Sequence, residues 1–173
     1  YLEEEHRRLT EELELQNKTD EELRSKSDSD PLTGIYSRRF ALEKMDLFMH
    51  QKKSYSLVYI DLDHLKWVND RYGHHAGDSY LKRFTAEFGT FLHEADIFAR
   101  IGGDEFVVLL PGYSEEEAAG QMESIRTGLR EKFDPPLLFS FGITFVSGES
   151  EHSVEEALNL ADQAMYQDKR TRR

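Results

Sequence analysis

The sequence has no cysteine, fewer basic than acidic residues and no long apolar run. Without cysteine, the 173-residue chain forms neither a disulfide framework nor a thiolate metal site, which fits a reducing compartment. No apolar run approaches the roughly 18–20 residues that span a bilayer, and no signal peptide is present. We therefore expect a cytoplasmic chain without direct membrane contact, although membrane anchoring upstream stays open.

The excess of acidic over basic residues also limits the partners of the chain. Lysine and arginine total 22 against 34 acidic residues, which gives a net charge of −12. This balance argues against nucleic-acid binding, which needs a basic surface. Because the overall field repels anions, an anionic substrate must be held by a local basic cluster or by bound metal.

Residues 1–27 are highly charged and have a helical pattern. Leucines fall at heptad spacing and on the adjoining seam of this helix: Leu2, Leu9, Leu23 and Leu13. The pattern predicts a weak two-stranded coiled coil, with a solvated single helix as the alternative. Because the helix is already under way at Tyr1 and no methionine precedes it, we expect a piece of a longer protein with an upstream sensor.

An Asp-Ser-Asp-Pro segment ends this helix, because Pro31 disfavours helical geometry in the residue before it. We expect a boundary near residue 29, with a signalling-helix stub at 1–29 and a folded domain at 30–173. In that domain we expect strands at 55–62, 97–101, 105–110 and 137–147. Helices are expected at 37–51, 64–71, 77–93, 115–132 and 154–169.

From residue 55 onward the elements follow the order βαββαβ plus a helix, the split βαβ arrangement of α+β folds. Right-handed crossovers place the third of these strands between the first two, antiparallel to both. The first strand then ends where the second turns into the third. This topology brings Asp61 to the edge that carries Asp104 and Glu105. We expect Gly102 and Gly103 to form a tight hairpin there by adopting positive φ.

Three carboxylates at one edge repel each other unless a hard cation neutralises them. Oxygen ligands suit Mg²⁺ or Mn²⁺, and Mg²⁺ typically binds through one or two carboxylates and substrate phosphates. Such sites catalyse in-line phosphoryl chemistry. A hairpin with solvated acids is the alternative. We expect Asp63 to cap the helix that starts at His64 instead of binding metal.

Several motifs occur in the order and at the spacing of one family. They lie at 30–39 (DPLTGIYSRR), 61–70 (DLDHLKWVND), 72–78 (YGHHAGD), 102–106 (GGDEF) and 161–166 (ADQAMY), followed by Lys169. The chain over about 28–173 resembles the GGDEF domains, the diguanylate cyclases. The resemblance implies a palm-like fold, as in nucleotidyl cyclases and ferredoxin-like domains, with 30–173 as the catalytic domain. It also implies synthesis of cyclic di-GMP from two GTP.

The resemblance further implies roles for individual residues at the acidic edge. By matching position, Asp61, the Leu62 carbonyl and Asp104 bind Mg²⁺ or Mn²⁺, and Asp104 helps to deprotonate the attacking 3′-hydroxyl. Glu105 matches a residue that activity requires. Gly102 and Gly103 of the signature turn belong to the substrate-binding set.

Guanine recognition is implied for Asn69 and Asp78, with His74 lining the same pocket. The chemistry agrees, because a carboxylate accepts from guanine N1–H and N2–H₂, which adenine lacks, and an unpaired buried acceptor is costly. Structural alternatives stay open for two of these residues. In the structural alternative for Asn69, this residue only ends a helix before Gly73. In the alternative for Asp78, this residue only complements a helix dipole.

Triphosphate contacts are implied for three basic side chains and two backbone amides: Lys66, Lys169, Arg173, His64 and Leu65. For the basic tail that begins at Lys169, the alternative is a solvated helix terminus that complements the dipole.

Some positions depart from the family pattern. The product-inhibition site has Arg-x-x-Asp, but His93 and Asp96 stand at its outer positions here. Because imidazole lacks the bidentate fork of guanidinium, we expect tight feedback inhibition to be lost. Ser37 replaces an asparagine and Arg172 a glycine, so the last residues are expected to run differently. His64 and Leu65 replace bulkier aromatic residues.

The sequence therefore predicts a Mg²⁺-dependent diguanylate cyclase that works as a homodimer, since each domain holds one GTP and half of the active site. A GTP-binding regulatory module without turnover is the alternative from another class. An enzyme that joins GTP with ATP is the third interpretation.

Overall fold

The structure is a computed structural model that describes residues 1–172, apart from the side chains of residues 25 and 26. The strands are β1 (Tyr36–Ser37), β2 (Tyr55–Leu62), β3 (Ile97–Arg100), β4 (Glu105–Pro111) and β5 (Phe139–Val146). The helices are α1 (Leu2–Asp28), α2 (Arg38–His50), α3 (Leu65–Tyr72), α4 (His74–Gly89), α5 (Glu115–Lys132) and α6 (Val154–Thr171).

The strands form one mixed sheet in the order β1-β3-β4-β2-β5. Strand β4 lies between β3 and β2 and is antiparallel to both, while β5 pairs antiparallel with the other edge of β2. This confirms the predicted α+β class and βαββαβ topology. Only the two-residue β1, which pairs parallel with β3, was not expected from the sequence.

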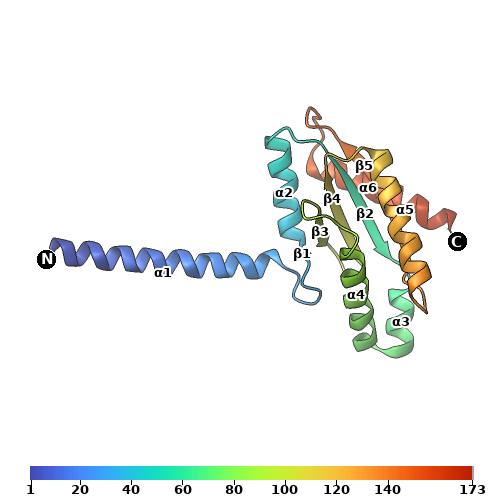
Figure 1. The fold of residues 1–173 in the computed structure, drawn as a ribbon, viewed down its shortest axis with the longest axis horizontal. Coiled ribbons are helices and arrows are strands. Elements are labelled where there is room, and N and C mark those ends of the chain that lie inside the picture. Colours follow the sequence, from blue (N-terminus) through green and yellow to red (C-terminus); the bar gives the residue numbers. More distant parts are fainter. Residues whose placement is uncertain (173) are drawn as a thin grey trace.

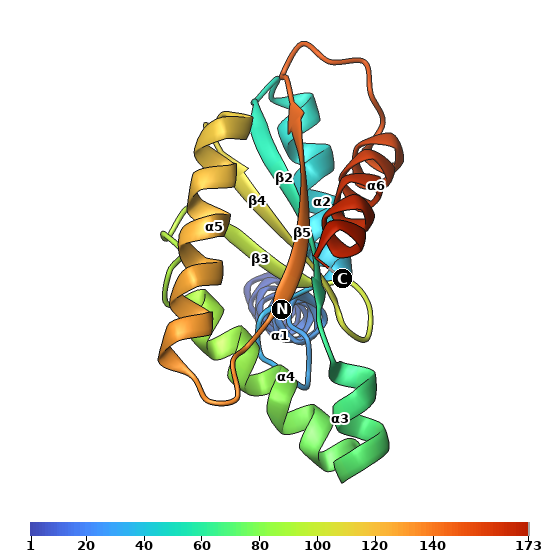
Figure 2. The same cartoon turned by 90° about the vertical axis from the view of Figure 1, so that its right-hand side faces the viewer.

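Helices cover both faces of the sheet (Figure 2). Because side chains of a strand alternate between faces, β2 contributes Val58 and Ile60 to the core under α4 and α5. Leu57 and Tyr59 point to the opposite face, where α2 and α6 pack. Every residue of β2 is buried, in keeping with its nearly continuous apolar sequence. The polar end of β2 is therefore held on a rigid central strand.

Helix α1 extends away from the domain as a separate arm (Figure 1). Its leucines are exposed, at Leu2, Leu9, Leu13, Leu15 and Leu23. The arm meets the domain through Arg39, whose guanidinium lies 2.5 Å from Asp28. The pairing of two such arms stays a prediction. Within the described residues, no helix has both the length and the apolar character that a membrane crossing requires.

The bounds of α4 differ from those expected. It begins at His74, directly after Gly73. The positive φ of Gly73, 89°, changes the direction of the chain between α3 and α4. It ends at Gly89 instead of continuing to His93, because the next residues form a turn. The Asp96 carboxylate closes that turn by accepting the His93 amide at 2.9 Å.

Candidate active site

An open cleft of about 600 Å³ lies at the end of β2. Its lining comes from the end of β2, from α3, from the hairpin after β3, from the segment that enters β5 and from the last turn of α6. The lining residues are Leu62, Asp63, His64, Leu65, Lys66, Trp67, Asp70, Asp104, Leu138, Ser140, Lys169 and Arg172. Lys66, Lys169 and Arg172 give this cleft a local basic wall in a strongly acidic chain.

The acidic residues converge at one side of this cleft. Asp61 is the direct cross-strand partner of Glu105, so both side chains emerge from the same face of the sheet. The Leu62 amide donates to the Asp104 carbonyl at 2.8 Å, which ties the hairpin to the end of β2. The expected convergence of these acids is thus confirmed, while their role as metal ligands stays a prediction.

The hairpin is built differently from the expectation. Positive φ was expected at Gly102 and Gly103, and this is wrong, because neither has it. A Cβ on Gly102 would lie 2.8 Å from Glu105 Oε2, so a larger residue there would displace the end of the Glu105 side chain. The Arg100 guanidinium binds both glycine carbonyls at 2.8–3.2 Å and lies 3.4 Å from Asp30. The turn is therefore held by an arginine clamp.

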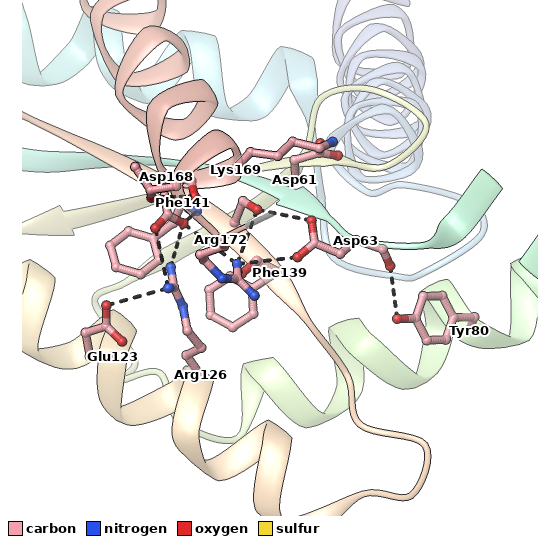
Figure 3. A network of polar contacts seen from close by, with 12 residues as sticks. Asp61, Asp63, Tyr80, Glu123, Arg126, Phe139, Phe141, Asp168, Lys169 and Arg172 are labelled. Atoms are coloured by element: carbon pink, nitrogen blue, oxygen red, sulfur yellow. Dashed lines mark hydrogen bonds and ion pairs between the residues drawn. The ribbon is translucent and has the colours of Figure 1, made fainter. Parts of the chain in front are cut away.

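Asp61 is the most perturbed acid of the site. Burial raises its pKa to about 6, the nearby Asp104 adds to this effect, and a hydrogen bond from Lys169 opposes it. Lys169 Nζ pairs with Asp61 Oδ2 (Figure 3). Burial disfavours the charged form of Lys169, but Asp61 and the neighbouring acids outweigh it and raise the pKa of the amine. Asp61 Oδ1 is buried and has no hydrogen-bond partner among the described residues.

These groups fit a hard divalent ion. A buried carboxylate oxygen without a partner is costly, and a second carboxylate, that of Asp104, lies beside it. The described residues contain no group of three or more side chains of the kind that holds a metal alone. Mg²⁺ does not need one, because it commonly uses one or two carboxylates together with substrate phosphates.

The raised pKa of Asp61 predicts how metal binding depends on pH. Asp61 can bind a metal ion only in its deprotonated form, so protonation of Asp61 competes with metal binding as the pH falls through about 6. We expect Mn²⁺ affinity to be steady well above that value and to fall about tenfold per pH unit below it. Titration of Mn²⁺ followed by electron paramagnetic resonance measures this. Equal affinity on both sides of that value would contradict the prediction.

The residues expected to recognise guanine lie at the corner between α3 and α4. The backbone carbonyl of Asn69 accepts the Gly73 amide at 2.9 Å, so Asn69 does help to end α3. Its side-chain amide packs where a Cβ on Gly77 would be, which places it against α4. The helix dipole favours acids mainly in the first turn, and Asp78 lies beyond the first turn of α4. Its position therefore argues against a role that only complements the dipole. His74 is exposed.

Asp63 has a role that the sequence did not indicate. It was expected to cap α3, and this is wrong: the N-cap of α3 is His64, without a side-chain cap. Asp63 instead accepts from the Ser140 hydroxyl at 3.1 Å and lies 3.4 Å from Arg172 (Figure 3). The position of a strand-ending acid does not reveal such partners, which come from β5 and α6.

Arg126 and Asp168 were also missed. Arg126 is buried on α5 and lies 2.7 Å from Asp168, which also accepts the Phe141 amide at 3.0 Å. The signal was available: Arg126 lies among the apolar positions Met122, Ile125 and Leu129 of α5. Arg173, expected to contact triphosphate, lies outside the described residues.

Comparison with known proteins gives the same family. Residues 27–173 match the family model described as diguanylate cyclase, GGDEF domain. Diguanylate cyclase DgcP of Pseudomonas aeruginosa is 36% identical over 163 residues, which cover 88% of this chain and 24% of that protein. Probable diguanylate cyclase DgcT of Escherichia coli is 34% identical over 83% of this chain and 34% of its own length. This chain spans less than half of each of these relatives.

The fold is shared with solved structures. The coiled coil and GGDEF domain of DgcB from Caulobacter crescentus, in complex with c-di-GMP, superposes with a TM-score of 0.84. It is 24% identical and covers 98% of this chain and 95% of its own, so it shows the fold alone. Diguanylate cyclase SiaD from Pseudomonas aeruginosa, in complex with its activator SiaC, gives a TM-score of 0.78 at 29% identity. That match covers 98% of this chain and 68% of the other.

Proposed function

Because the chain belongs to the GGDEF diguanylate cyclase family, we propose that residues 30–173 form a catalytic domain that condenses two GTP into cyclic di-GMP and two pyrophosphate. The observation that carries the proposal is the meeting of Asp61, Asp104 and Glu105 beside a cleft with a basic wall. Incubation with GTP and Mg²⁺, followed by mass spectrometry of the nucleotides, tests it. Bound GTP without a cyclic product would favour a regulatory module.

Asp61, Asp104 and the Leu62 carbonyl would hold the ion, as the buried, unpartnered Asp61 Oδ1 supports. When bound, Mg²⁺ supplies charge neutralisation at the phosphates and activation of the attacking hydroxyl. Members of this family generally depend on a divalent metal. In each step a 3′-oxygen attacks an α-phosphorus, the bond to pyrophosphate breaks, and the Asp104 carboxylate helps to accept the hydroxyl proton.

Glu105 completes the acidic edge, and its carboxylate is held in place. Tyr59 donates a hydrogen bond to Glu105 Oε2 at 3.2 Å from its buried position on β2. Burial and the neighbouring Glu105 raise the pKa of Tyr59, so its hydroxyl stays a donor at neutral pH. The Glu105 carboxyl group is therefore held in a fixed position at the acidic edge.

The triphosphate would lie along the basic wall of the cleft, against Lys66 and Lys169. Support comes from the start of α3, where no side chain caps the helix and the first-turn amides are available to phosphate oxygens. His64 and Leu65 lie at that start. Gly102 and Gly103 stay in the proposed substrate-binding set as residues of the hairpin that carries Asp104. In-line alignment and charge stabilisation then supply most of the rate.

Guanine would bind at the corner of α3 and α4, through Asn69 and Asp78 with His74 as a wall. The Asp78→Ser variant is expected to relax base choice, because the carboxylate that accepts from guanine N1–H and N2–H₂ is gone. We expect GTP preference over ATP to fall about tenfold or more, the scale of one hydrogen bond to a charged group. A mixed-nucleotide competition assay measures this. Unchanged preference would remove this role, and a mixed product from the unsubstituted chain would favour the third interpretation.

Two domains must face each other, since each 3′-hydroxyl attacks the α-phosphate of the other GTP. The exposed leucines of α1 would bring the domains together under an upstream sensor. We therefore expect activity per chain to rise with protein concentration in the micromolar range. Initial rates over a dilution series measure this. A rate that stays proportional to enzyme at every dilution would contradict a homodimeric site.

A further inference from the structure

Arg172 is the C-cap of α6 at the edge of the cleft, and within the described residues its polar contacts are all made by one nitrogen. Arg172 Nη1 donates to the Phe139 carbonyl and, at 3.2 Å, to the Ser140 hydroxyl. The same atom lies 3.4 Å from Asp63 and 3.8 Å from Asp168. Nη2 and Nε are therefore left as donors on a side chain that lines the cleft (Figure 3).

The partners of Arg172 are themselves fixed. Asp168 is bound by Arg126 at 2.7 Å and by the Phe141 amide at 3.0 Å. Arg126 is buried, and its guanidinium lies 4.3 Å from the Phe141 ring centre. Because α5 and β5 both hold Asp168, that carboxylate offers a rigid anchor for the neighbouring guanidinium.

The unused face of Arg172 suits a phosphate group. Guanidinium presents two parallel N–H donors that match two phosphate oxygens, a geometry that a lysine ammonium lacks. The nearby acids, Asp63 and Asp168, contact Arg172 at Nη1, so Nη2 and Nε keep their donors for a ligand. In a chain with a net charge of −12, each cation that lines this cleft contributes to attracting an anion.

We propose that Arg172 binds the triphosphate of the nucleotide through Nη2 and Nε, while the contacts of Nη1 with the Phe139 carbonyl, the Ser140 hydroxyl and Asp63 hold its side chain in place. The inference rests on the proposed function for the location of the triphosphate, but its test does not require turnover. The competing explanation is a purely structural one, in which Arg172 only neutralises its acidic neighbours and the helix dipole.

The test compares two ligands, a non-reactive GTP analogue with an α,β-methylene bridge and guanosine monophosphate, each titrated calorimetrically in the presence of Mg²⁺. For Arg172→Gln we expect analogue affinity to fall about tenfold or more, while monophosphate affinity stays within about twofold. Arg172→Lys keeps the charge without the fork and is expected to recover part of the loss. Arg170→Gln is the matched control, because Arg170 is an exposed arginine of the same helix end.

The outcomes separate the explanations. Unchanged analogue affinity in Arg172→Gln, an equal loss for both ligands, or an equal loss in the Arg170 control would each overturn the inference. A chain that turns over GTP but shows one of these results keeps its proposed function. A chain that makes no cyclic product but shows the expected ligand discrimination loses that function and keeps the Arg172 contact.

Discussion

Asp104→Ala is expected to lower cyclic di-GMP formation about a hundredfold to a thousandfold, while the domain stays folded. The substitution removes one of two carboxylates proposed to hold the ion, and loss of one preorganised charge-stabilising group costs about 10²–10³ in rate. The fold is expected to persist, because the hairpin is tied to β2 by the Asp104 backbone carbonyl, which alanine retains. Removal of a like charge beside Asp61 also relieves repulsion in the metal-free domain. Product chromatography and thermal unfolding measure the two effects.

Glu94→Gln is the matched control for that experiment. It removes a negative charge of the same chain from an exposed loop outside the cleft. Its activity is expected to stay within about twofold of the unsubstituted chain, since surface substitutions away from a site have small effects. Equal losses in both variants would mean that net charge, and not the acidic edge, sets the rate.

Gly142→Ala is expected to destabilise the domain by about 3 kcal/mol, because the added methyl group has no space. Gly142 lies on β5 beneath α6, and a Cβ there would lie under 3.0 Å from backbone atoms of Ala161, Ala164 and Met165. Backbone cannot move aside as a side chain does, so α6 must shift away from the sheet. Because α6 carries Lys169, we expect nucleotide affinity to fall as well. Urea denaturation gives the free energy of unfolding.

The same substitution on α5 provides the comparison. Gly120 is exposed in a helix interior, and nothing lies within 4 Å of the position of an added Cβ. Gly120→Ala is expected to stabilise the domain by about 0.5–1 kcal/mol, since alanine is the better helix former. A destabilisation of similar size in both variants would refute the steric argument for Gly142.

Much of the site's framework could be predicted from the chain alone. The run Tyr55–Leu62 is apolar almost throughout, which indicated a strand, and β2 has those bounds. Short apolar strands on either side of a glycine pair indicated the hairpin. With the handedness of crossovers, these local patterns sufficed to bring Asp61 to Glu105 across the sheet.

The errors concern side chains whose partners come from other elements. Asp63 looked like a helix cap because the residues that bind it, Ser140 and Arg172, are distant in the sequence. The hairpin glycines looked like positions of positive φ, whereas neither adopts it and the Arg100 guanidinium binds their carbonyls. No local pattern contains that information.

The sequence by itself determined the family, the order of the elements and the edge where the acids meet, because strand alternation, turns and crossover handedness are local or topological rules. Only the tertiary structure decided which side chains pair with the acids in and around the site. Lys169 pairs with Asp61, Tyr59 with Glu105, and Arg172 with Asp63 and Asp168. The reason is physical. Pairing of a side chain depends on the packing of α6 and β5 onto β2, which brings together groups that no spacing in the chain relates.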